Sequence, residues 1–183
     1  HMQSLVGLGK TYKATFILGA SSNTDDLTGT ITKHPIENPI TEEQIKKSIK
    51  SFIGPIEQIP PAFSAIKIKG QKMYEAARKG KPLEAKPRSV ALYAYDLESP
   101  ITQNEDGTIS FSVSMSCSSG TYIRALARDL GKMLKTGGYV QTLERTSIGP
   151  ISLDQSVPLK DLSKENWTPK LLPVEELLKA LEI

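Results

Sequence analysis

The chain is poor in the residues that build disulfides and metal centres: its 183 residues include one cysteine, Cys117, and two histidines. A lone cysteine excludes an internal disulfide and fits a reducing compartment. His1 and Met2 resemble a vector-derived scar, which leaves His34 as the only other histidine. One cysteine and one histidine are too few for a Cys/His zinc site. We therefore expect no metal site, and histidine acid–base chemistry is open only to His34.

Long apolar runs are also missing, because no stretch of about 18 consecutive apolar residues occurs and no membrane span is expected. No signal-peptide pattern is visible. Composition is otherwise ordinary, with 38% hydrophobic and 23% charged residues. The length suits one domain with appendages.

The net charge of +3 is unevenly distributed along the chain. Residues 61–88 carry eight lysines and arginines and two glutamates, a net charge of +6 that leaves −3 for the remainder. A basic segment of this kind is typical of a surface that binds a polyanion such as nucleic acid. We favour nucleic acid, and a solvated lysine-rich hairpin is the alternative that charge alone leaves open.

Hydrophobic periodicity and capping signals predict the first elements. Residues 10–18 alternate as a strand does, and residues 21–29 form a turn-rich loop. Thr41 and Gln44 make a capping box that begins a helix, which Gly54-Pro55 ends. The basic segment opens at Pro60-Pro61, and its sequence predicts a turn around Gly70 followed by a short helix that stops at Gly80.

The second half of the chain continues this mixture of strands and helices. Residues 109–117 alternate apolar residues with serines, which is typical of a half-buried strand. Further predicted elements are a strand at 88–98, a helix from Gly120 to Gly137-Gly138, an extended segment at 139–146, and short helical pieces near 159–162 and 174–181. Strands separated by isolated helices predict an α+β fold with a mixed or antiparallel sheet and flanking helices.

The most informative stretch is residues 117–128, CSSGTYIRALAR, which joins a strand to a helix. If Thr121 is the N-cap, Arg124 lies in the first helical turn, against the positive end of the helix dipole. A cation at that place suggests an anionic partner, either a buried carboxylate or a phosphate. A solvent-facing arginine that tolerates its position is the alternative.

Two other patterns invite a functional reading that the residues do not support. Gly9-Lys10-Thr11 lacks the earlier glycine of a P-loop, and a strand follows it where a helix is required. Asp25 and Asp26 are paired carboxylates, which serve acid–base chemistry or metal binding in some sites. Aspartates in a turn more often bind their own backbone, and we favour that role here.

Several segments, in order along the chain, resemble the TruB family of tRNA pseudouridine synthases. KTYKATFILG with TDDLTG is similar to a conserved strand and loop of that family, and CSSGTYIRALARDLG is similar to its arginine motif. VQTLERTSIG resembles the strand that follows. IEQIPPAFSAIKIKGQKMYEAARKGKPLEAKPR resembles the family's RNA-binding thumb, which we assign to residues 59–88. The resemblance covers about residues 9–153, and LLPVEELL near residue 171 also fits.

The resemblance implies an isomerase that flips the TΨC-loop uridine of tRNA (U55) from its stack, as base-modifying enzymes must. An aspartate attacks the nucleotide, the glycosidic bond breaks, and C5 of the turned uracil rejoins the sugar without metal or cofactor. By the same resemblance, Tyr12 would stack on the uracil and Arg124 would pair with the catalytic aspartate. Tyr122 and Leu143 would line the uracil pocket. The thumb residues expected to touch RNA phosphates are Lys67, Lys69, Lys72, Arg78 and Lys79.

The sequence also departs from the family pattern. The Gly-His-x-Gly-Thr-Leu-Asp motif that carries the nucleophile occurs nowhere in the 183 residues. We therefore expect residues 3–170 to be a partial catalytic domain, followed at 171–183 by the start of a C-terminal extension, without a PUA-type RNA-binding domain. We expect this polypeptide to be a cytoplasmic monomer that binds the tRNA T-arm but is inactive alone. A non-catalytic RNA-binding or tRNA-folding module is the alternative.

Overall fold

The computed structural model describes residues 5–171 and 173–180. The predicted scar at residues 1–2 lies outside this range, as do residues 172 and 181–183 of the predicted C-terminal extension. No helix among the described residues is long and apolar enough to cross a membrane.

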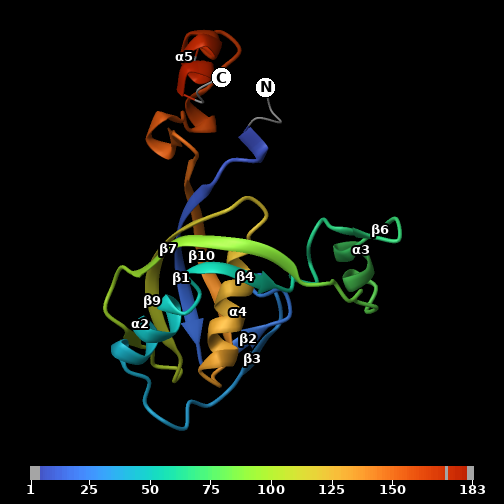
Figure 1. The fold of residues 1–183 in the computed structure, drawn as a ribbon, viewed down its shortest axis with the longest axis vertical. Coiled ribbons are helices and arrows are strands. Elements are labelled where there is room, and N and C mark those ends of the chain that lie inside the picture. The colour runs from blue at the N-terminus through green and yellow to red at the C-terminus, as the bar shows by residue number, and fades with distance from the viewer. Residues whose placement is uncertain (1–4, 172, 181–183) are drawn as a thin grey trace.

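A seven-stranded sheet forms the centre of the molecule, in the order β11-β10-β1-β9-β7-β4, with β8 beside β9 (Figure 1). All pairings between its named strands are antiparallel, which confirms the predicted α+β class. The strands are β1 (Lys10–Leu18), β4 (Gly54–Gln58), β7 (Arg88–Leu97), β8 (Thr102–Gln103), β9 (Ile109–Cys117), β10 (Gly138–Ile148) and β11 (Ile151–Ser152). A separate hairpin pairs β2 (Ala20–Ser22) with β3 (Ile31–Lys33).

Two helices, α2 (Glu42–Lys50) and α4 (Ile123–Met133), cover one face of the sheet. Their apolar stripes join the inward side chains of β1, β7 and β9 in one core, which contains Ile45, Leu126 and Phe16. The regular alternation of burial along β9 confirms the half-buried strand predicted at 109–117. Because α2 and α4 share one face, the serines of β9 lie on the opposite face of the sheet.

The predicted helix at Thr41 is confirmed at its start but ends earlier than expected. Thr41 and Gln44 form both hydrogen bonds of the capping box. The helix stops at Lys50, and residues 54–58 form β4, a strand that the sequence analysis missed. Gly54 has φ +104°, a left-handed conformation that glycine adopts at little cost, and it turns the chain into the pairing with β7.

The predicted thumb leaves and re-enters the sheet at neighbouring points. Gln58 ends β4 opposite Arg88, which begins β7, so residues 59–87 form an insertion between two paired strands. This segment projects to one side of the sheet (Figure 1). It contains β5 (Lys67–Ile68), β6 (Gln71–Lys72) and α3 (Met73–Arg78), joined at Lys69 and Gly70, which both have positive φ. The turn around Gly70 and the short helix are therefore confirmed.

The C-terminal part extends away from the sheet, on the side where β1 begins (Figure 1). It contains three short 3-10 helices, η1 (Leu153–Gln155), η2 (Leu159–Asp161) and η3 (Thr168–Lys170), followed by α5 (Val174–Ala180). The predicted helical pieces near 159–162 and 174–181 agree with η2 and α5, except for residue 181, which lies outside the described residues.

Candidate functional site

The start of α4 is fixed by a side chain from β4. The N-cap is Tyr122 and not Thr121, the residue considered from the sequence, so Arg124 is the second residue of the helix. The buried amide of Gln58 binds the backbone of this N-cap residue: its Oε1 accepts from the backbone N–H of Tyr122 at 2.8 Å, and its Nε2 donates to the carbonyl of Tyr122 at 3.1 Å. Thr121 instead turns its hydroxyl back to the carbonyl of Ser118. Gln58 therefore satisfies the N–H of the N-cap residue, as the N3 glutamate or glutamine of a capping box does.

Arg124 is bound by three groups from two distant segments. Its Nη1 donates to Asp26 Oδ2 at 2.8 Å and to the carbonyl of Thr24 at 2.9 Å, and its Nη2 donates to the carbonyl of Phe63 at 3.0 Å. Arg124 thus has an anionic partner within the chain, whereas the pairing with a catalytic aspartate that the resemblance implies stays a prediction. Three of the five guanidinium N–H groups are used by these contacts. The other two have no acceptor among the described residues.

Asp26 holds both its own loop and Arg124. Its Oδ1 accepts from the hydroxyl of Thr24 and from the backbone and hydroxyl of Thr28, as expected of a turn aspartate. Its Oδ2 faces Arg124. Burial raises the pKa of this carboxyl, but the hydrogen bonds from Thr28 and Thr24 and the charge of Arg124 outweigh burial, and the net pKa is lowered. With four donors on its oxygens, the Asp26 carboxylate is an ionised anchor and a poor nucleophile.

A second ion pair lies one turn along α4. Arg128 Nη1 donates to Asp25 Oδ2 at 2.8 Å, and its Nη2 donates to the carbonyl of Ile59, also at 2.8 Å. The Nε of Arg128 donates to Asp129 at 2.9 Å. Burial raises the pKa of the Asp25 carboxyl, and the charge of Arg128 opposes that rise. The paired aspartates of the loop thus meet two arginines spaced i, i+4 on one helix face.

Tyr12 lies on β1, half-buried at the edge of the core. Its cross-strand neighbours are Arg145 on β10 and Met115 on β9. Burial is the main cause of a raised pKa for Tyr12, with Cys117 adding to it and Arg145 opposing it. The phenol of Tyr12 is therefore protonated at neutral pH.

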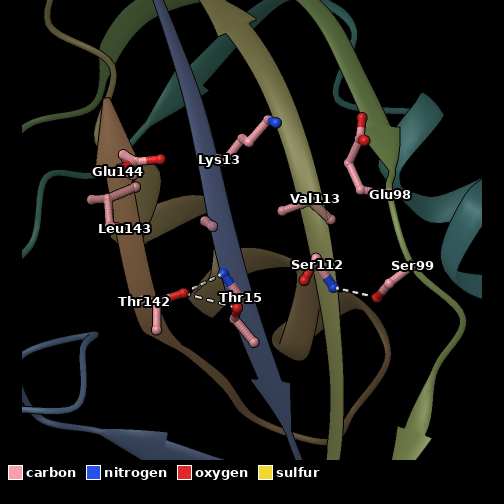
Figure 2. Close-up of a pocket in the computed structure, with 10 residues that line it drawn as sticks. Lys13, Thr15, Glu98, Ser99, Ser112, Val113, Thr142, Leu143 and Glu144 are labelled. Atoms are coloured by element: carbon pink, nitrogen blue, oxygen red, sulfur yellow. Dashed lines mark hydrogen bonds between the residues drawn. The ribbon is translucent and has the colours of Figure 1, made fainter. Parts of the chain in front are cut away.

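Leu143 lies on β10 beside Ala14 of β1 and is 46% exposed. It borders a groove of about 530 Å³ over β1, β9 and β10, whose other lining residues are mostly polar or charged (Figure 2). Thr142 donates its hydroxyl to Thr15 across this groove at 2.8 Å. Neither Tyr12 nor Arg124 lines this groove, which therefore does not by itself join the predicted site residues.

Both the loop that carries Asp25 and Asp26 and the helix α4 contact strand β10, which carries Leu143. Asp26 forms an isolated parallel bridge with Val140 of β10, and the Val140 N–H donates to the carbonyl of Asp25. The loop that binds Arg124 is thereby attached to the strand that carries Leu143. Tyr122 and Arg124 come from the start of α4, which packs on β10 and β1.

Some of the predicted phosphate-binding residues of the thumb contact other side chains, and others are exposed. Lys72 lies 3.7 Å from Glu75 and 3.2 Å from the hydroxyl of Tyr74. The guanidinium of Arg78 lies over the ring of Tyr74, 5.3 Å from its centroid. The side chains of Lys67, Lys69 and Lys79 are exposed. No group of three or more His, Cys, Asp or Glu side chains that could hold a metal gathers among the described residues.

Sequence reasoning missed the partner of the helix start, Gln58, and the partners of the two arginines. Gln58 lay within the thumb-like motif without an assigned role, and Asp25 and Asp26 were interpreted only as turn aspartates. The signal that was available is the coincidence of two adjacent acids in a loop with two arginines four residues apart on a helix.

Family models match almost the whole chain. Residues 1–123 match the TruB family pseudouridylate synthase N-terminal domain, and residues 124–181 match the tRNA pseudouridylate synthase B C-terminal domain.

Similar proteins carry the name tRNA pseudouridine synthase B. One from Bacillus pumilus is 40% identical over 98% of this chain and 60% of its own length. Another from Paenarthrobacter aurescens is 41% identical over 88% of the chain and 52% of its length, and one from Prochlorococcus marinus is 43% identical over 94% and 53%. The chain therefore spans a little over half the length of these relatives.

Solved structures share the fold at low sequence identity. A Cbf5-Nop10-Gar1 complex contains a chain that matches with a TM-score of 0.61 and 23% identity, over 97% of this chain and 45% of that one. An H/ACA RNP bound to a substrate RNA containing 2'-deoxyuridine matches with a TM-score of 0.55 and 21% identity, over 87% and 35%.

Proposed function

The chain belongs to the TruB family of pseudouridylate synthases, and we propose on that premise that its full-length protein isomerises the TΨC-loop uridine of tRNA, U55, to pseudouridine. The observation that carries the proposal at residue level is the ion pair between Arg124 and Asp26. The pair holds a half-buried guanidinium in a fixed orientation with two N–H groups left for another anion. A nucleophilic carboxylate is the anion that this chemistry requires.

Arg124 serves to orient that nucleophile. Asp26 lowers the cost of keeping the guanidinium charged away from water, and the remaining N–H groups bind the nucleophilic carboxylate in a set geometry. Such pre-organisation places the attacking oxygen against the flipped nucleotide without a rearrangement at the moment of reaction.

Tyr12 stacks on the flipped uracil and offers its hydroxyl near C5. Its raised pKa keeps the phenol protonated at neutral pH, so Tyr12 acts as a stacking platform and hydrogen-bonding group and not as a resting base. The exposed side chain of Leu143 and the ring of Tyr122 complete an apolar pocket for the base.

Residues 59–88 bind the tRNA T-arm through phosphates. Lys67, Lys69 and Lys79 present exposed cations on a segment that projects from the sheet, whereas Lys72 and Arg78 are partly engaged with Tyr74. We further propose that residues 3–170 form a partial catalytic domain and that a C-terminal extension begins at residue 171. The protein is proposed to act on tRNA as a monomer in the cytoplasm, without a metal or cofactor.

The 183-residue polypeptide is proposed to be inactive alone, because it contains no Gly-His-x-Gly-Thr-Leu-Asp motif and Asp26 is already bound by four donors. The test measures tritium release from C5-labelled uridine in tRNA transcripts. The full-length protein should release tritium from U55, whereas a transcript with cytidine at that position should release none. Release by the 183-residue polypeptide itself would refute its proposed inactivity.

A second candidate is a non-catalytic RNA-binding or tRNA-folding module, which the basic thumb favours. Both candidates require salt-sensitive tRNA binding, with log K falling by about 0.9 for each duplex phosphate contacted. Binding that is unaffected by salt would count against the thumb in both. Full-length protein that binds tRNA in this way but releases no tritium from U55 would favour the second candidate.

A further inference from the structure

The segment that leads from β4 into the thumb is held by side chains of α4 and not by strand pairing. Residues 59–63, IPPAF, contain Pro60 and Pro61, which are buried and lack backbone N–H groups. Two carbonyls of this segment, Ile59 and Phe63, instead accept from Arg128 and Arg124 at 2.8 and 3.0 Å. The orientation of the thumb root therefore depends on two side chains of one helix.

Arg128 is the residue at which these contacts converge. One guanidinium joins the thumb root through Ile59, the loop through Asp25, and its own helix through Asp129. Asp25 is buried, with its side chain only 11% exposed, so an uncharged replacement of Arg128 leaves a buried carboxylate without its ion-pair partner. Arg128 also lines a groove of about 440 Å³ under the thumb, between Pro60 and Leu83.

The backbone conformation and hydrogen bonds of Asp25 fix the position of the carboxylate that pairs with Arg128. Its φ is +61°, a left-handed conformation that costs a residue other than glycine energy and that asparagine and aspartate tolerate best. The backbone is fixed on both sides, because its N–H donates to Ser22 and its carbonyl accepts from Val140 of β10. The Asp25 carboxylate is thereby anchored to the sheet, and Arg128 connects that anchor to the thumb.

We propose that Arg128 and Asp25 are a positioning pair that holds the thumb root against α4, so that the thumb cations and Arg124 face the same RNA in one fixed orientation. The proposal rests on the proposed function, since it names a positioning role within that site. Neither residue contacts reacting atoms. Loss of the pair should loosen the thumb and weaken productive tRNA binding, while the chemical step on bound tRNA continues.

The first arm of the test needs no RNA. Hydrogen exchange of the 183-residue chain is followed by mass spectrometry for wild type, Arg128→Met and Asp25→Asn. Asparagine keeps the size and the left-handed tolerance of Asp25 and removes only its charge. Both variants should exchange faster in peptides that cover residues 59–74, where Met73 and Tyr74 donate to Ile66 and Ser64. The control Lys132→Met removes an exposed cation from the same helix and should leave these peptides unchanged.

The second arm uses the full-length protein and tRNA. Loss of a charge-assisted contact should raise KM about tenfold in either variant, with kcat within about twofold of wild type. The double variant Asp25→Asn/Arg128→Met should be no worse than Arg128→Met, because the two residues act as one unit.

Unchanged exchange at residues 59–74, or a fall in kcat with KM unaltered, would overturn the proposal. If Arg128→Met does not fold, Asp25→Asn still decides it. If the wild-type full-length protein forms no pseudouridine, the proposed function is wrong. The hydrogen-exchange measurement would still show whether Arg128 and Asp25 hold the thumb.

Discussion

The side-chain amide of Gln58 binds both backbone polar groups of Tyr122, from 64 positions away in the sequence. This pair joins the last residue of β4 to the N-cap of α4, the helix that carries Arg124 and Arg128. It gives the N–H of the N-cap residue the acceptor that the N3 glutamate or glutamine of a capping box ordinarily provides.

We expect Gln58→Met to destabilise the fold by about 1–3 kcal/mol, because it leaves the Tyr122 N–H without its acceptor while keeping a similar side-chain volume. The Tyr122 carbonyl still accepts from Leu126 in the variant. Urea unfolding of the 183-residue chain measures the change. Gln103→Ala, at an exposed position of β8, should shift stability by no more than about 0.5 kcal/mol. Equal stability of Gln58→Met and wild type would show that the Gln58–Tyr122 contact is not needed.

Arg124→Lys should separate catalysis from binding in the full-length protein. Lysine carries the charge, but its three donors on one nitrogen cannot replace the fork that binds Thr24, Asp26, Phe63 and a second carboxylate, so kcat should fall by about 10²-fold. The affinity for tRNA should stay nearly unchanged. Single-turnover rates and filter binding measure the two quantities, and equal losses in both would identify Arg124 as a phosphate contact.

Asp26 should make stability depend on pH in the acid range. Its folded-state pKa is lowered, so its contribution is fully present above the unfolded value of about 3.9 and is lost as pH falls through the folded value. The difference in unfolding free energy between wild type and Asp26→Asn should therefore shrink over that interval. A difference that stays constant down to about pH 2.5 would mean that the charge of Asp26 is not what stabilises the loop.

Tyr95→Phe should raise the stability of the chain. Within residues 5–171 and 173–180, Tyr95 Oη is the one buried side-chain oxygen or nitrogen without a hydrogen-bond partner, and it lies in the core beside Phe16 and Phe52. Removing the hydroxyl should increase the unfolding free energy by about 1 kcal/mol. Tyr93→Phe on the same strand is the control, because Tyr93 is 62% exposed. A loss of stability in Tyr95→Phe would indicate a partner for the hydroxyl, such as an ordered water.

Local sequence determined the elements whose signals are local. The alternation of 109–117 and the strand at 10–18 followed from period-two patterns, and the helix at Thr41 followed from its capping box. The turn at residue 70 requires a left-handed backbone conformation, and the glycine at that position indicated a turn. Each signal depends on residues a few positions apart, so the folded chain could not easily override it.

Tertiary structure alone decided the partners at the candidate site. Arg124 and Asp26 are 98 positions apart, and the sequence identified a cation in need of an anion without saying which acid would meet it. The choice follows from the fold, which attaches the loop between β2 and β3 to β10 and brings its aspartates to the arginines of α4. Polarity is a property of one residue, whereas an ion pair requires two segments to be brought together, and only the packing of the sheet against its helices does that.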